Sequence, residues 1–246
     1  MIPRARLVLG TAKFGMPWYG YGSTSRPTAH ESIAILRHAW RQGIGLFDTA
    51  LGYGDAAALL AHAGIPTFCQ VMKARAPLSV PKPGRWEAAL VHNPTLDELI
   101  HTPAAYGVSV YTVTQVLDAQ RLGIVPIQAP ASCLNPPVSV DFARAPFLQG
   151  VLLRDPAAAP AGLQRAVRAF QALADEAGVS RVALALHSAH RRADGFLVFG
   201  VSSVAQLDAV LEAADQTVPA DLIDAARDLA TTVDATAALP SLWSKA

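Results

Sequence analysis

Short apolar runs, bounded by glycine, proline and other turn residues, recur along the whole chain. Eight of them have the length and composition of buried β-strands, and most are apolar on both faces. Strands of that kind are typical of a parallel sheet that is covered on both sides. The eight runs span residues 6–12, 45–50, 67–74, 88–94, 106–111, 124–130, 147–153 and 196–200.

Helical spacing of apolar residues occurs between these runs, as in the segment 28–41, where Ile33, Leu36 and Trp40 recur. The eight strands alternate with helices or with shortened connections. This order predicts a (β/α)8 TIM barrel with several shortened outer helices, built as a single domain over residues 1–246. The predicted helices span residues 28–41, 55–62, 95–100, 112–122, 161–177, 179–189, 203–214 and 220–233.

The connections after the third, fourth and sixth predicted strands are short and rich in proline, so they leave no room for full outer helices. Both faces of a parallel barrel need cover. The strand surface around Phe68, Gln70 and Met72 must therefore be shielded by loops, by the C-terminal tail or by another subunit. We expect a homodimer, or a protein partner that covers the shortened helices.

Composition narrows the class of partner. The 246 residues are 52% hydrophobic and 16% charged, and 20 basic residues balance 19 acidic ones without a dense basic run. A nucleic acid or an anionic membrane is therefore not expected as a partner, and a small molecule is. No apolar run has membrane-spanning length and the N-terminus lacks a signal-peptide pattern, so we expect a cytoplasmic protein. Cys69 and Cys133 have no metal-site spacing and are expected to be free, reduced thiols.

Four polar side chains stand at or just beyond the carboxyl ends of consecutive predicted strands: Asp48, Tyr53, Lys73 and His92. This edge of a parallel barrel is where enzymes of this fold carry their chemistry. Lys73 and Asp48 end apolar strands and must either reach solvent or pair, because an unpaired buried charge is very unfavourable. The alternative interpretation is a structural Lys–Asp pair with a solvent-facing tyrosine and histidine.

These residues and their neighbours resemble the aldo-keto reductase family, and the similarity covers most of the chain. It implies an enzyme that moves a hydride between a nicotinamide cofactor and a carbonyl or alcohol substrate. The order of the fragments and the spacing from Asp48 to Tyr53 are its most specific features. The similar segments are Leu9–Gly15, Phe47–Gly54, Lys73, Val91–Pro94, Gly107–Tyr111, Ile127–Pro130, Phe147–Leu153 and Phe199–Leu207.

The resemblance implies a role for each of the four polar residues. Tyr53 is the general acid that protonates the carbonyl oxygen. A free phenol has a pKa of about 10, and the Lys73 ammonium is expected to lower it, while Asp48 holds that lysine in place and charged. His92 is expected to orient or polarise the substrate carbonyl. The nicotinamide carries the redox chemistry.

The resemblance also implies cofactor contacts. Gln128 and Ser109 match the residues that bind the nicotinamide carboxamide, although Val110 stands where the family often has asparagine. Ser202, Ser203 and Gln206 match the phosphate and adenosine site at a helix N-terminus. This segment has no lysine or arginine for a 2′-phosphate. NADPH is the expected cofactor because the family usually takes the phosphorylated form, and NADH is the alternative.

Other readings of the same residues stay open. The polar group could serve acid/base chemistry without net redox, such as elimination, isomerisation or cyclisation. Lys73 could act as the amine of a Schiff-base lyase, although Asp48 would keep it charged and poorly nucleophilic. The barrel could also be a binding or regulatory subunit that senses a cofactor.

Two further segments carry expectations. The aromatic loop 14–21, with Trp18, Tyr19 and Tyr21, is expected either to form one wall of a substrate pocket or to pack against the barrel top. The stretch 187–192 holds two histidines and two arginines on a helix. It is expected to be a solvent-exposed face.

Overall fold

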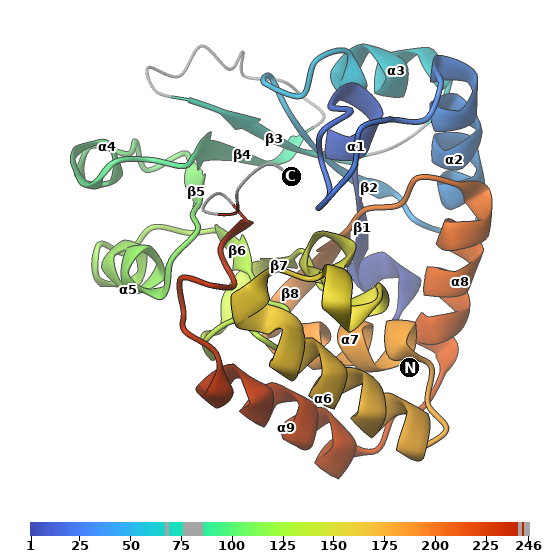
Figure 1. Cartoon of the computed structure of the whole chain (residues 1–246). Coiled ribbons are helices and arrows are strands. Elements are labelled where there is room, and N and C mark those ends of the chain that lie inside the picture. Colours follow the sequence, from blue (N-terminus) through green and yellow to red (C-terminus); the bar gives the residue numbers. More distant parts are fainter. Residues whose placement is uncertain (67–68, 76–85, 241–242, 244–246) are drawn as a thin grey trace.

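Eight parallel strands close into a barrel in the computed structural model, which describes residues 1–66, 69–75, 86–240 and 243 (Figure 1). Each strand pairs with the next along the chain, and β8 pairs with β1 to complete the ring. The predicted (β/α)8 barrel is therefore confirmed. The strands are β1 Leu7–Gly10, β2 Leu46–Ala50, β3 Cys69–Ala74, β4 Trp86–His92, β5 Gly107–Ser109, β6 Ile127–Pro130, β7 Val140–Arg144 and β8 Ala193–Phe199.

The helices lie outside the strands, and several are short, as expected (Figure 1). Helix α4 has five residues and α3 has seven. The α-helices are α1 Ala12–Gly15, α2 Ala29–Arg41, α3 Ala56–His62, α4 Leu96–Ile100, α5 Val113–Arg121, α6 Gln164–Glu176, α7 Arg181–His190, α8 Val204–Asp215 and α9 Ala220–Asp228. The 3-10 helices are η1 Arg4–Arg6, η2 Leu148–Leu153, η3 Pro156–Ala158, η4 Ala161–Leu163 and η5 Leu229–Thr232.

Capping boxes fix the starts of three helices. In each, a threonine side chain accepts a hydrogen bond from a backbone N–H three residues later, and the glutamate or glutamine there bonds back to the threonine N–H. Helices α2, α4 and α5 therefore begin where the pattern T-x-x-E/Q places them. The pairs are Thr28 with Glu31, Thr95 with Glu98, and Thr112 with Gln115.

The prediction for the seventh strand was wrong. Strand β7 lies at residues 140–144, inside the segment that we expected to be a connection, and residues 147–153 are mostly the 3-10 helix η2 rather than a strand. Ala145, Leu148 and Gln149 have φ values of 57°, 48° and 54°. An extended strand requires negative φ, so the chain cannot continue as a strand through these positions.

The interior of the barrel has an apolar layer below a polar one. Side chains two residues apart share one face of a strand. On four strands, the residue two positions beyond a member of the apolar layer is polar, and these residues are Asp48, Lys73, His92 and Arg144. The polar layer therefore lies at the carboxyl ends of the strands. The apolar layer is Val8, Leu46, Val71, Ala88, Leu90, Phe142 and Val198.

Most of the stretch 187–192 is buried or half-buried, contrary to expectation, and Arg191 alone is exposed. His187 is 7% exposed because α7 packs against β7, β8, α8 and α9. Arg192, just beyond α7, is 2% exposed and donates to the carbonyl oxygens of Ser132 and Asn135. No group of three histidine, cysteine, aspartate or glutamate side chains in the described chain could hold a metal ion. This helix is a core element rather than an interaction surface.

The expected subunit partner stays a prediction. Met72, one of the residues expected to need cover, is 4% exposed and packs with Ala74, Ala89 and Tyr106 of the same chain. Phe68 lies outside the described residues. None of the helices that the structure describes is long and apolar enough to cross a membrane.

Cys133 is a free, buried thiol, and burial raises its pKa to about 12. It is therefore a protonated, unreactive core residue. The Cys69 side chain lies outside the described part of the chain.

Candidate active site

The four predicted residues Asp48, Tyr53, Lys73 and His92 lie together at the carboxyl edge of the barrel. Asp48, Lys73 and His92 point inward from β2, β3 and β4, and Tyr53 follows from the loop after β2. Asp48 and Lys73 are 3% and 1% exposed and form an ion pair. A buried lysine and a buried aspartate thus satisfy each other, as their burial demands.

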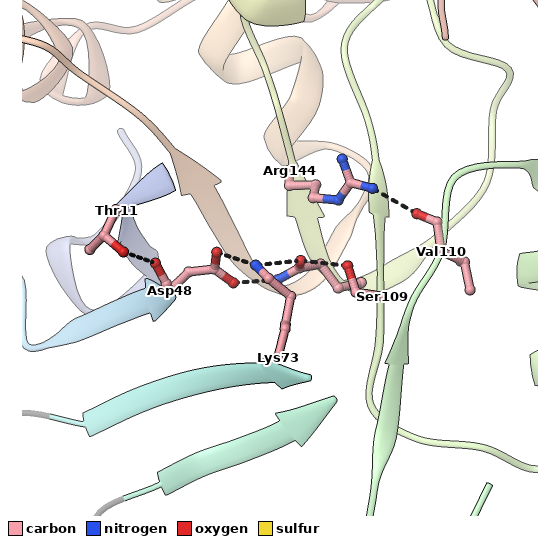
Figure 2. A network of polar contacts seen from close by, with 7 residues as sticks. Thr11, Asp48, Lys73, Ser109, Val110 and Arg144 are labelled. Atoms are coloured by element: carbon pink, nitrogen blue, oxygen red, sulfur yellow. Dashed lines mark hydrogen bonds and ion pairs between the residues drawn. The ribbon is translucent and has the colours of Figure 1, made fainter. Parts of the chain in front are cut away.

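Gln128 and Ser109 extend this ion pair into a buried network (Figure 2). The Gln128 Nε2 donates to Asp48 Oδ2 at 2.8 Å, and its Oε1 accepts from Ser109 Oγ at 2.9 Å and from Lys73 Nζ at 3.3 Å. Both residues are at most 1% exposed. Both the nitrogen and the oxygen of the Gln128 amide are therefore hydrogen-bonded, and this residue of β6 holds the ion pair in place.

Two glycines place Tyr53. A Cβ added to Gly15 would lie 1.7 Å from the carbonyl oxygen of Tyr53, so α1 approaches this loop as closely as only glycine permits. Gly54 has φ of 55°, the left-handed region that glycine adopts readily. Leu51 N–H also donates to the Lys73 carbonyl at 3.0 Å, which fastens the loop to β3.

The ring of Tyr53 lies near both Lys73 and His92. Lys73 Nζ is 5.2 Å from the centroid of the Tyr53 ring. The Tyr53 and His92 rings meet edge to face, with centroids 6.0 Å apart and planes at 86°. Among the described residues, Lys73 donates side-chain hydrogen bonds to Asp48 and Gln128, and none joins it to Tyr53. The ammonium thus approaches the ring without bonding to the hydroxyl.

Burial controls the ionisation of this site. It raises the pKa of Tyr53 above its usual range, and the Asp48 carboxylate adds to the rise. The expected lowering of this pKa by Lys73 is therefore not found, because burial and the Asp48 carboxylate dominate. Burial, followed by the charges of Lys73 and Arg144, lowers the pKa of His92 to about 3. At neutral pH, Tyr53 is a protonated phenol and His92 a neutral imidazole.

A cleft of about 810 Å³ opens above these side chains. The aromatic loop lines it through Trp18, Tyr19 and Tyr21, so this loop forms a wall of the cleft. Trp243 lines it from the C-terminal segment and packs edge to face on Tyr21, with ring centroids 5.1 Å apart. Tyr53, Lys73 and His92 form part of the cleft lining. The polar layer of the barrel is thus open to a small molecule.

A second cleft, of about 370 Å³, lies beside the N-terminus of α8. Ser202 and Gln206 line it, whereas Ser203 caps the helix by accepting from the Gln206 N–H at 3.1 Å. Lys13 and Arg154 also line this cleft. The segment 200–206 has no basic residue of its own, and the fold brings these two cations to it from elsewhere in the chain.

Arg144 is the one residue of the polar layer that the sequence prediction missed. It ends β7 and lines a small cavity of about 80 Å³ together with Asp48, Tyr53, Lys73 and His92. The prediction placed the seventh strand too late. A strand placed at residues 140–144 would have predicted this residue. Val140, Phe142 and Arg144 alternate with a period of two, so they share one face of the strand, as the inward-facing residues that end in Asp48 and Lys73 do.

Comparison with known proteins gives structural relatives only. No protein-family model matches the chain, and no curated protein matches its sequence. An aldo-keto reductase from Bacillus halodurans, solved in its holo form, is 18% identical with a TM-score of 0.70, over 94% of this chain and 92% of that one.

Two further solved structures are similar. A glycerol dehydrogenase from Gluconobacter oxydans is 17% identical with a TM-score of 0.64, over 94% of this chain and 92% of its own. A thermostable aldo-keto reductase in complex with the inhibitor epalrestat is 17% identical with a TM-score of 0.61, over 93% of this chain and 95% of its own. The chain therefore has the barrel fold of the aldo-keto reductases.

Proposed function

We propose that this chain is a nicotinamide-dependent oxidoreductase that reduces a carbonyl compound, with Tyr53 as the general acid. The observation that carries the proposal is that Tyr53, the buried Asp48–Lys73 pair and a neutral His92 lie together beside an open cleft. The similarity in fold to aldo-keto reductases supports it.

The residues divide the proton transfer between them. Tyr53 keeps its proton at neutral pH because its pKa is raised, and it donates that proton to the carbonyl oxygen as the oxygen gains negative charge. The resulting phenolate lies near the Lys73 ammonium, which Asp48 holds charged. Neutral His92 can donate a hydrogen bond to the same oxygen and orient the carbonyl. Water then returns a proton to Tyr53.

The residues present fit the outer part of a nicotinamide dinucleotide. The cofactor would supply the hydride. Lys13 and Arg154, with Ser202 and Gln206 at the N-terminus of α8, form a cationic cleft suited to phosphate groups. These two cations favour NADPH over NADH in the proposal, because an added phosphate would meet uncompensated positive charge.

The inner part of the cofactor site fits less well. Ser109 and Gln128 are bonded to each other and to the ion pair, and neither lines any of the three cavities described above. In this arrangement they position Lys73 and do not present free groups to a carboxamide. Val110, where the resembling family often has asparagine, is fully buried. The carboxamide contacts expected from the resemblance would require Gln128 to exchange partners.

Removing the Tyr53 hydroxyl tests the proposal. Tyr53→Phe should keep NADPH binding and lower aldehyde reduction by about 10²- to 10⁴-fold, the usual contribution of a proton-transfer group. Tyr106→Phe is a matched control, because this tyrosine packs beside β3 and does not line the cleft. NADPH consumption and cofactor-induced thermal shifts would be measured for all three proteins. Wild-type turnover by Tyr53→Phe would refute the role of Tyr53.

Non-redox acid/base chemistry is the second candidate, and the engagement of Gln128 with Asp48, Ser109 and Lys73 is the observation that favours it. The same tyrosine, histidine and lysine would then move protons in an elimination or isomerisation. Absence of both a thermal shift and oxidation with NADPH and NADH would make this the better proposal.

A further inference from the structure

The polar layer contains one cation without a carboxylate partner. Lys73 is neutralised by Asp48, but Arg144 forms no ion pair with any described residue. The only hydrogen bond that its side chain makes to a described residue runs from Nη2 to the carbonyl oxygen of Val110, at 2.8 Å. Its Nε is buried and has no hydrogen-bond partner. The Arg144 side chain as a whole is half-buried, but a buried Nε without a partner is unfavourable unless something else satisfies it.

The surrounding structure holds this guanidinium in a fixed orientation. Arg144 stacks on the Tyr111 ring, with its Cζ 4.4 Å from the ring centroid. The Tyr111 ring therefore holds one face of the Arg144 guanidinium, and the Val110 carbonyl, just after β5, holds one of its terminal nitrogens. Figure 2 shows the other terminal nitrogen turned away from Val110. The remaining terminal nitrogen, Nη1, is therefore held in position to donate a charged hydrogen bond to a carboxylate.

Arg144 also lies close to the reacting groups. It lines the same small cavity as Tyr53, Lys73 and His92. Its charge acts on three of its neighbours: it partly offsets the rise in the pKa values of Tyr53 and Tyr19, and it adds to the lowering of the pKa of His92. Strand β7 lies across the closed barrel from β3, which carries Lys73. A small molecule between these two strands would therefore meet Lys73 on one side and Arg144 on the other.

We propose that Arg144 is a specificity residue that binds the carboxylate of the substrate, so that the preferred substrates are carbonyl compounds that also carry a carboxylate. This inference rests on the proposed carbonyl reduction for the reaction itself. The anion contact, however, follows from the guanidinium alone and can be measured without turnover.

Paired substrates test the proposal. Phenylglyoxylate and 4-formylbenzoate place the carboxylate at two distances from the carbonyl, and their methyl esters remove only the charge. Wild type should prefer the acid of at least one pair by about 10- to 150-fold in kcat/KM, the range for a hydrogen-bonded charge. Arg144→Met should lose this preference, so that kcat/KM falls more for each acid than for its methyl ester. Arg144→Lys should restore part of it, because it keeps the charge without the fork.

Arg121→Met provides the control, since Arg121 is an exposed residue of α5 paired with Asp118. It should keep the wild-type preference for acids. Thermal melting of each variant checks that the fold survives. A wild type with no acid preference in either pair, or an Arg144→Met variant that retains the preference, would overturn the assignment.

Calorimetry with benzoate separates this inference from the proposed reaction. Arg144-dependent benzoate binding by a protein that oxidises neither NADPH nor NADH would support the anion site and refute the redox proposal. Reduction of the neutral esters, with benzoate binding unaffected by Arg144→Met, would support the redox proposal and refute the anion site.

Discussion

Replacing Lys73 by methionine is the sharpest test of how the site is held together. The substitution keeps an unbranched apolar stem in the barrel and removes the ammonium. Asp48, only 3% exposed, then remains a buried carboxylate without its cation. It keeps the hydrogen bond from Gln128 Nε2, which lies 2.8 Å away. Lys73→Met therefore measures what an unpaired charge costs in this barrel.

The expected loss of stability is large. Removing one partner of a buried ion pair destabilises a protein by about 3–5 kcal/mol. Since Gln128 still donates to the carboxylate, we expect the lower end, about 3 kcal/mol in the free energy of unfolding. For a chain of this size each kcal/mol lowers Tm by about 2–4 °C, so the fall should be about 6–12 °C.

The loss should depend on pH in a defined direction. Protonation of Asp48 removes the unpaired charge, so the deficit relative to wild type should be largest at pH 7 and smaller at pH 5. The double variant Asp48→Asn/Lys73→Met has no buried charge and should recover part of the loss. Urea denaturation of the three proteins at both pH values measures this. A deficit below about 1 kcal/mol, or one unchanged by pH and by the second substitution, would refute the buried-pair reasoning.

Three further expectations follow from individual contacts. His92 has a pKa of about 3 in the folded chain, against 6.5 for a free imidazole. The unfolded chain therefore binds this proton at a higher pH, and the free energy of unfolding should fall as the pH drops from about 6.5 toward 3. His92→Gln should flatten that slope in urea titrations. Gly15→Ala should displace Tyr53 and lower turnover by about 10²-fold, as a 1 Å misplacement can, and unchanged kinetics would contradict the close packing. Arg154→Gln should raise the Kd for NADPH by about tenfold or more while sparing NADH, as fluorescence titration would test.

The sequence predicts the barrel well because its signal is local. An apolar run that follows a turn and precedes a helix is recognisable without the rest of the chain. The seventh strand is the exception, and its failure has a physical cause. Asp141 interrupts the apolar pattern of β7, yet its carboxylate accepts the Ile127 N–H at 2.7 Å and is useful there. The more apolar segment 147–153 is buried as a 3-10 helix, and composition alone does not distinguish these two conformations.

The sequence predicts those site residues whose direction is fixed by the two-residue alternation of a β-strand. Asp48, Lys73 and His92 end inward-facing strand patterns, so their convergence follows from the fold. The raised pKa of Tyr53 does not follow from the pattern, because it depends first on how deeply the fold buries the phenol and then on the nearby Asp48 carboxylate. Similarly, no local pattern places Lys13 and Arg154 at the N-terminus of α8, since both reach it from distant segments.

The polar layer explains why a misplaced strand matters more for function than for fold. Either placement of the seventh strand closes an eight-stranded barrel, but only β7 at residues 140–144 turns Arg144 into the mouth. Without that residue the polar layer contains a neutralised Asp48–Lys73 pair and a neutral His92, and the exposed Arg75 is the other cation that lines the cleft. With it, one side of the mouth carries an uncompensated charge. In the role proposed for Arg144, the identity of one inward-facing residue would set the class of substrate that the same barrel selects.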